Sequence, residues 1–289
     1  MKHHYIPEFY SKQWATGDDR KVLRYRRLPS GLVVPKRLAP AAFGYRDDLY
    51  RAPYEDQRRA QALELRFFSR LDNAAAKALA VLTDVTLPTL PERAVGIWAH
   101  FILSLLHRSP AYFESVQRAG TEHYKIALQD LRERYNDLRK ESDPETFEEY
   151  VDTLDASDPK RSVFQTFPRL VFNRNILDYM GQMTWFSVDA DDSCPTLLLS
   201  DDPVTRTNGL HRPDGHLAIP LSPTRMLVGT HTPEFADHLH TMRRKDLFRG
   251  LNESTVGGAR EFVAAIDGRQ ERFIQKRFGR ALRNALAGA

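Results

Sequence analysis

The residues best suited to chemistry lie at the start of the chain, where His3 and His4 precede several aromatic side chains. A neutral imidazole is a good metal ligand, and it is a general base near neutral pH. Chain ends are usually frayed, so an aromatic leader of this kind is expected to pack against the protein. In an extended segment, adjacent side chains point to opposite faces. Either one histidine enters a site, or both anchor the leader through hydrogen bonds.

Asp201 and Asp202 follow the apolar run 196–199 and precede Pro203. Carboxylates at the end of a buried strand are fixed by the strand and exposed by the turn, which suits a metal ligand or a base. The same residues are typical of turns, because aspartate accepts hydrogen bonds from nearby backbone amides. Both interpretations stay open from the sequence.

Three further charged residues are candidates for the same site. Glu64 and Asp72 share one row of a helix predicted over 55–82, about 12 Å apart along its axis. This separation is too large for one catalytic pair unless another element lies between them, and the alternative is a pair of boundary residues. Arg108 ends a very apolar helix, where it either caps backbone carbonyls or binds a phosphate or carboxylate.

Other signals exclude several classes of protein. The chain has no phosphate-binding glycine loop, dinucleotide fingerprint, nucleophile elbow or zinc helix. A single cysteine, Cys194, rules out an internal disulfide and a cysteine-rich zinc site. No secretory signal and no apolar stretch long enough for a bilayer is present, so we expect a cytoplasmic protein with no membrane partner.

The charge distribution is uneven. The net charge is +4, with basic residues concentrated in 20–37 and 269–283 and acidic residues in 141–158. Such asymmetry is compatible with nucleic acid or another polyanion as a partner. The simpler alternative is a set of solvated helix faces. The pattern predicts no oligomeric state.

The apolar periodicity predicts an α+β fold, with a helical middle region packed against a mixed or antiparallel sheet formed by the N- and C-terminal segments. We expect one domain over 1–289, divided into an N-terminal motif and hairpin (1–50), a helical region (51–182), and strands with closing helices (183–289). Helices are predicted over 55–82, 92–118 (kinked or split at Pro110), 121–139, 144–154, 159–182, 233–250 and 269–286. Strands are predicted over 22–26, 32–34, 185–188, 196–200, 217–221 and 225–229, and 262–266 is either a strand or a helix turn.

Five short motifs, taken in order, carry a resemblance to a known family. They are His3-His4-Tyr5-Ile6-Pro7, Arg108-Ser109-Pro110, Leu199-Ser200-Asp201-Asp202-Pro203-Val204, Pro220-Leu221-Ser222-Pro223 and Leu251-Asn252. With them, the chain resembles the bacterial domain of unknown function 4238 family. The resemblance implies no established activity, but it adds Tyr5, Ser200, Ser222 and Asn252 as positions to inspect. It also favours Asp201 over Asp202, because the family pattern tolerates replacement of that aspartate least.

Together these signals predict a metal-assisted hydrolase, in its most specific form a nuclease-like phosphodiesterase. The expected divalent-metal ligands are His4, Asp201, Glu64 and Asp72. His3 or His4 is the general base, Asp202 lies in the catalytic site, and Arg108 anchors a phosphate. The alternative is a non-catalytic sensor, regulator or toxin-like binding protein with a basic surface for nucleic acid or a protein partner. The hydrolase hypothesis requires the imidazoles of the leader to face Asp201.

Overall fold

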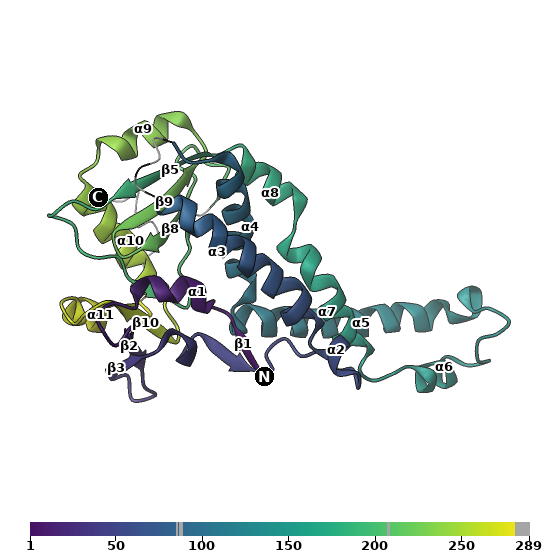
Figure 1. The fold of residues 1–289 in the computed structure, drawn as a ribbon. Helices are drawn as coiled ribbons and strands as arrows, with labels where there is room; N and C mark the ends of the chain where they lie inside the picture. Colours follow the sequence, from purple (N-terminus) through teal and green to yellow (C-terminus); the bar gives the residue numbers. More distant parts are fainter. Residues whose placement is uncertain (85, 87–88, 207–208, 281–289) are drawn as a thin grey trace.

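The computed structural model describes residues 1–84, 86, 89–206 and 209–280, and Figure 1 shows their arrangement. A block of helices is formed by the middle of the chain, and strands from both chain ends lie beside it. The fold is α+β, as predicted. Within these described ranges, no helix combines the length and the apolar character needed to cross a membrane.

Every strand pairing among the described residues is antiparallel. One sheet has the order β3-β2-β10-β6, a second has the order β5-β9-β8-β7, and β1 pairs with β4. The first sheet therefore joins the N-terminal hairpin to strands from the last third of the chain. The strands are β1 (Lys2–His4), β2 (Val22–Arg27), β3 (Val33–Leu38), β4 (Tyr45–Asp47), β5 (Thr184–Asp189), β6 (Leu199–Ser200), β7 (Thr205–Arg206), β8 (His216–Ser222), β9 (Arg225–Thr230) and β10 (Phe262–Ala265).

The helices follow the predicted apolar periodicity with clear ends. The α-helices are α1 (Glu8–Ser11), α2 (Gln57–Ala60), α3 (Ser69–Leu82), α4 (Glu92–Arg108), α5 (Pro110–Leu138), α6 (Phe147–Thr153), α7 (Asp158–Val171), α8 (Arg174–Gly181), α9 (Pro233–Thr241), α10 (Arg244–Gly258) and α11 (Glu271–Arg277). Short 3₁₀ turns are η1 (Lys12–Trp14) and η2 (Pro40–Ala42), and a π-helical turn, η3 (Leu63–Phe68), precedes α3.

The break between α4 and α5 lies at Ser109, next to the expected Pro110. Ser109 has extended backbone angles, and its hydroxyl accepts the N–H of Tyr112 at 3.3 Å. Pro110 occupies the first position of α5, where its missing N–H costs nothing. The structure therefore has a split rather than a kink, and α5 then runs on through the separately predicted 121–139 helix.

Other predicted helices are divided or shorter. The 159–182 helix is two helices, because Asn173 is extended and caps α8 by accepting the N–H of Ile176. The 233–250 helix is likewise α9 and the start of α10, and the closing helix ends at Arg277. Residues 281–286 of that predicted helix lie outside the described residues.

The aromatic leader is packed into the main core. Tyr10 and Trp14 are fully buried. The Tyr10 hydroxyl donates to the Pro220 carbonyl at 2.5 Å, and Trp14 Nε1 donates to the Leu197 carbonyl at 2.8 Å. The leader is thus held by segments about 200 residues later in the chain.

The main hydrophobic core contains residues from all three predicted segments, such as Trp14, Trp98 and Leu227. A core shared in this way is what one folding unit requires. The organisation of 1–289 as one domain nevertheless stays a prediction.

Candidate functional site

His3 lies in β1 and is fully buried, with both ring nitrogens engaged. Its Nδ1 accepts the backbone N–H of Tyr50 at 2.8 Å, and its Nε2 lies 2.7 Å from Gln61 Oε1. Because the glutamine oxygen can only accept, Nε2 carries the proton and the ring is neutral. Burial lowers the pKa of His3, which favours the same neutral form. This geometry matches the anchoring alternative for His3.

His4 contributes its backbone more than its ring. Its carbonyl accepts a hydrogen bond from Arg108 Nη2 at 2.5 Å, and its imidazole packs against Tyr45 with ring centroids 5.4 Å apart. Nε2 is buried and has no hydrogen-bond partner among the described residues. Burial lowers the pKa of His4, so the uncharged ring is favoured.

Arg108 ends α4 and is fully buried, with its guanidinium enclosed by three groups. Two nitrogens donate to Asp72, at 2.7 and 3.2 Å, and one also donates to the His4 carbonyl. The ring of Phe68 lies 4.4 Å from the guanidinium carbon. Burial acts to lower the pKa of Arg108, but Asp72, Tyr50 and Glu64 together outweigh it and the pKa is raised. The expected phosphate anchor is therefore already paired with a carboxylate.

Glu64 approaches the same guanidinium from the π-helical turn η3. One of its carboxylate oxygens is buried with no hydrogen-bond partner among the described residues. Burial raises the pKa of Glu64 to about 7; Arg108 opposes the shift and Asp72 adds to it. The element that the sequence analysis required between Glu64 and Asp72 is thus the side chain of Arg108. We call His3, His4, Glu64, Asp72 and Arg108 the sealed cluster.

The sealed cluster does not assemble the expected metal ligands. Glu64 and Asp72 face Arg108, whereas Asp201 is bound elsewhere. Among the residues that the structure describes, no group of three or more His, Cys, Asp or Glu side chains is placed to hold a metal ion. The predicted ligand set of His4, Asp201, Glu64 and Asp72 is therefore not gathered into one site.

Asp201 is committed to the backbone of the loop between α10 and β10. Its two carboxylate oxygens accept the backbone N–H groups of Arg260, Glu261 and Phe262, each at 3.1 Å. Burial raises the pKa of Asp201 to about 6, while these hydrogen bonds act to lower it. Asp201 thus fixes the start of β10 through amides 59 to 61 residues later in the chain, which differs from the local turn contacts considered from the sequence.

Asp202, the next residue, lines an open pocket of about 390 Å³ between the start of α5 and the loop before β10. Three arginines also line this pocket, one from α5, one from β7 and one from the loop before β10: Arg118, Arg206 and Arg260. We call it the arginine pocket. Its remaining lining residues are Leu105, Leu106, Ser109, Ala111, Tyr112, Glu114, Ser115 and Asp201.

The arginine pocket carries positive charge that the protein leaves available. The side chains of Arg118, Arg206 and Arg260 make no ion pair or hydrogen bond with the rest of the described chain, and each residue is exposed. The amino-terminal end of α5 adds a partial positive charge, because its first backbone N–H groups lack helical partners. Ser109 adds a hydroxyl group, whereas the Ser115 hydroxyl already donates to the Tyr112 carbonyl at 2.6 Å. The carboxyl groups of Glu114, Asp201 and Asp202 also line the pocket, so it is the three arginines, and not the net charge of the pocket, that suit an anion.

The Asp202 carboxyl accepts no hydrogen bond from the described residues. Burial raises its pKa, while Arg206 and Arg260 act to lower it. Asp202 is held in place by its backbone, since its N–H donates to the Ser200 hydroxyl at 3.2 Å. Its carboxyl also lies against α10, where a Cβ added at Gly258 would be 3.7 Å from Oδ2. The contrast with Asp201 reverses the preference drawn from the sequence, because Asp202 has the available carboxyl.

Tyr5 is the part of the leader that approaches this region. Its hydroxyl donates to Glu261 at 2.7 Å, and Glu261 also pairs with Arg46 at 2.6 Å. Burial and then Glu261 raise the pKa of Tyr5, and Asp201 is close enough to contribute. The leader therefore does reach the acidic corner, but through a tyrosine and not through the imidazoles as expected.

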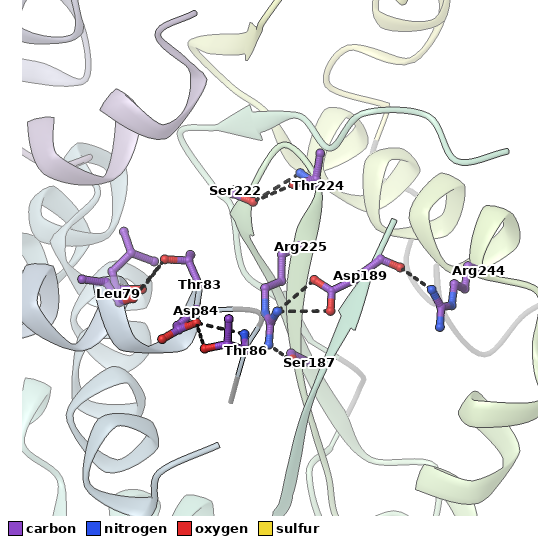
Figure 2. A network of polar contacts seen from close by, with 11 residues as sticks. Leu79, Thr83, Asp84, Thr86, Ser187, Asp189, Ser222, Thr224, Arg225 and Arg244 are labelled. Atoms are coloured by element: carbon purple, nitrogen blue, oxygen red, sulfur yellow. Dashed lines mark hydrogen bonds and ion pairs between the residues drawn. The ribbon is translucent and has the colours of Figure 1, made fainter. Parts of the chain in front are cut away.

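The other candidate positions have structural contacts. Ser200 is buried and orients Asp202 as described. Asn252 is buried and holds the segment that precedes β6. Its Oδ1 accepts the Leu198 N–H at 2.8 Å, and its Nδ2 donates to the Thr196 carbonyl at 2.9 Å. Figure 2 shows Ser222 at the β8–β9 hairpin, where its hydroxyl accepts the N–H of Thr224 at 3.3 Å.

Sequence reasoning missed the three arginines of the pocket. They lie at positions 118, 206 and 260, and Arg118 and Arg260 approach the motif aspartates only in space, whereas Arg206 lies two residues after the 199–204 motif. The available signals were Asp201 and Asp202, which line the pocket, and Ser109, which both caps α5 and lines the pocket.

These motifs are shared with a described family. A family model whose description is "Protein of unknown function (DUF4238)" matches residues 2–269. The chain belongs to the DUF4238 family. No curated protein and no solved structure matches the chain. Within this DUF4238 protein, two motifs meet at the arginine pocket: Asp201-Asp202 and Ser109.

Proposed function

We propose that this DUF4238 protein binds a phosphate group of a nucleotide or nucleic acid in the arginine pocket. The observation that carries the proposal is the set of three arginines, Arg118, Arg206 and Arg260, around one pocket without ion-pair partners in the described chain. Guanidinium groups bind phosphate oxygens through paired hydrogen bonds. Binding alone would fit a sensor or regulatory protein, the non-catalytic alternative from the sequence.

Isothermal titration calorimetry with the dinucleotide pdTpdT tests this proposal. Arg206→Gln/Arg260→Gln removes two charge-assisted contacts, each worth about 1.5–3 kcal/mol, so affinity should fall at least about tenfold. Arg58→Gln/Arg70→Gln is the matched control, because these exposed arginines have no ion pair in the described chain and lie outside the pocket. Equal affinities for the two double variants would refute the proposal.

A second candidate function is hydrolysis of the bound phosphodiester, and the available Asp202 carboxyl favours it. Burial already raises the pKa of Asp202, and a phosphate bound beside it raises that pKa further by like-charge repulsion. Water attacks the phosphorus and releases a proton to solvent, and a protonated Asp202 can then donate its proton to the leaving oxygen as its bond to phosphorus breaks. The divalent metal predicted from the sequence would serve this hydrolysis, and phosphate binding alone would not require it.

Release of p-nitrophenol from bis(p-nitrophenyl) phosphate tests the hydrolase candidate, with Mg²⁺, with Mn²⁺ and with a chelator. Asp202→Asn keeps the shape but cannot donate the proton. Because p-nitrophenolate leaves without protonation, this variant is assayed on cleavage of pdTpdT to thymidine 5′-phosphate, where kcat should fall by about 10²-fold or more. Affinity for pdTpdT should be kept or modestly increased, because the variant removes the repulsion between the carboxylate and the phosphate. Wild-type protein that binds pdTpdT but releases no p-nitrophenol under any of the three conditions would leave the binding function alone standing.

A further inference from the structure

The hairpin of β2 and β3 carries three cations on one face of its sheet. Arg24 and Lys36 are direct cross-strand partners, and Arg26 lies two residues along the same strand as Arg24. Side chains at paired positions and at i, i+2 share a face of a sheet. Arg24, Arg26 and Lys36 therefore lie together.

This arrangement is unfavourable for the protein alone. Like charges directly opposite each other destabilise a strand pair. Burial lowers the pKa of Arg24, and Arg26 lowers it further, which shows that the two charges repel. None of the three side chains has an ion pair in the described part of the chain, and Arg24 Nε is buried without a hydrogen-bond partner. By contrast, Arg37 on the opposite face pairs with Asp19 at 2.7 Å.

A protective role at the sheet edge accounts for only part of this cluster. Edge strands often carry lysine to prevent pairing with other chains, and β3 is an edge strand. That explanation covers Lys36. It does not cover Arg24 and Arg26, because β2 is an internal strand paired on both sides.

The cationic face leads toward the arginine pocket. Arg26 is the cross-strand partner of Phe262 at the start of β10, and the pocket residue Arg260 lies two residues before Phe262. Arg46 lies along the same route, paired with Glu261 and within electrostatic reach of Glu114, which also lines the pocket. The intervening acid, Glu261, is thus neutralised by Arg46.

We propose that a single-stranded nucleic acid lies with its phosphates across Arg24, Arg26 and Lys36 and continues into the arginine pocket. The inference rests on the proposed phosphate binding and identifies the ligand as a strand of several nucleotides. A flexible strand can follow a sheet face and then turn into a pocket. A duplex is stiff, with a persistence length of about 150 base pairs, so it cannot bend its backbone into a pocket of about 390 Å³. Proteins that bind single strands combine such basic tracks with an aromatic group for stacking, and Tyr112 in the pocket can supply one.

Fluorescence anisotropy with labelled oligothymidylate of twelve nucleotides tests this inference. Arg24→Gln/Arg26→Gln should weaken oligothymidylate binding at least about tenfold and leave pdTpdT binding in the pocket unchanged. The salt dependence of binding should also become shallower, by about 1.4 in the slope of log K against log[salt] for two lost phosphate contacts. Lys36→Gln should act in the same direction with about half that change.

The controls separate the possible failures. Arg58→Gln/Arg70→Gln lowers net charge equally and should bind oligothymidylate like the wild type. Since removal of Arg24 and Arg26 relieves repulsion, that variant should melt at or above the wild-type temperature, so misfolding would be seen as a lower melting temperature. The inference would be overturned if Arg24→Gln/Arg26→Gln bound oligothymidylate with wild-type affinity, or if the control pair lost as much affinity as this variant. It would also be overturned if the wild type bound a twelve-base-pair duplex as tightly as oligothymidylate, or if polyglutamate competed as well as unlabelled oligothymidylate. The pocket is tested separately by pdTpdT binding to Arg206→Gln/Arg260→Gln. Loss of binding supports the proposed phosphate site, and wild-type binding refutes it.

Discussion

The sealed cluster and the arginine pocket share the α4–α5 junction, which gives Arg108 to the cluster and Ser109 to the pocket, and they use similar residues in opposite ways. In the sealed cluster, the charge of Arg108 is satisfied by Asp72 and by a backbone carbonyl. In the pocket, Arg118, Arg206 and Arg260 have no such partner in the described chain, and Asp202 accepts no hydrogen bond there. Charged residues that the protein satisfies internally contribute to folding, and those that it leaves open are available to a ligand. The motif residues divide in this way even within one dipeptide, Asp201-Asp202.

The largest expected effect of a substitution is in the sealed cluster. Arg108→Met leaves Asp72 and the His4 carbonyl without their donor, and breaking a buried pair from one side costs about 3–5 kcal/mol. Arg260→Gln in the pocket removes a charge with no ion pair and should change the free energy of unfolding by less than about 0.5 kcal/mol. Urea denaturation of both variants measures the difference. Similar losses for the two arginines would abolish the distinction between the regions.

The two adjacent aspartates give the next largest contrast. Asp201→Asn turns one acceptor oxygen into a donor that faces backbone N–H groups, so about 2 kcal/mol of stability should be lost at pH 7. Asp202→Asn should lie within about 0.5 kcal/mol of the wild type, because its carboxyl accepts no hydrogen bond in the described chain. Thermal and urea unfolding of the pair are the measurement. A less stable Asp202→Asn than Asp201→Asn would reverse their assigned roles.

Glu64 makes the sealed cluster sensitive to pH. Its pKa is raised from 4.5 to about 7, so the folded protein holds a proton that the unfolded chain releases earlier. The Glu64 contribution to stability is therefore full below about pH 4.5 and falls as pH rises to about 7. Glu64→Gln removes this loss, and the variant should exceed the wild type by at most about 2 kcal/mol at pH 8 and by little at pH 4. Urea unfolding at both pH values measures it, and a pH-independent difference would contradict the assignment.

The smallest expected effect belongs to the pocket. Because a bound phosphate raises the pKa of Asp202, binding of pdTpdT should take up a fraction of a proton near neutral pH. Relative to Asp202→Asn, the affinity of the wild type should therefore increase modestly as pH falls. The comparison subtracts the titration of the terminal phosphate of pdTpdT, which both proteins share. Calorimetry in two buffers of different ionisation enthalpy measures the proton uptake. Equal proton uptake by the wild type and Asp202→Asn would exclude Asp202 as its source.

The sequence predicted the fold class and most helices because apolar periodicity reports directly on burial. It also placed β2, β3, β5, β8 and β9 near their observed positions, and only Leu199–Ser200 of the predicted 196–200 strand pairs in a sheet. The short strands β1, β4 and β7 were not predicted. Periodicity did not locate the breaks at Asn173 and near Met242, which depend on local extended backbone. These caps are single-residue features within otherwise helical patterns.

The site was harder to predict than the fold. Residue type alone cannot distinguish Asp201 from Asp202, because the difference lies in three backbone amides of the 260–262 segment. Similarly, the pairing of Arg108 with Asp72 joins positions 36 residues apart, and the pocket arginines come from three separate segments. The motifs indicated the region through Ser109, Asp201 and Asp202, which line the pocket, and through Tyr5, whose hydroxyl donates to Glu261.

The most direct test of the central claim compares pdTpdT binding to His3→Gln/His4→Gln and to Arg206→Gln/Arg260→Gln by calorimetry, with concentrations corrected for the folded fraction. The pocket variant should lose at least about tenfold in affinity, while the folded histidine variant should bind like the wild type. The opposite result, loss in the histidine variant and wild-type affinity in the pocket variant, would place the site at the leader imidazoles and contradict this account.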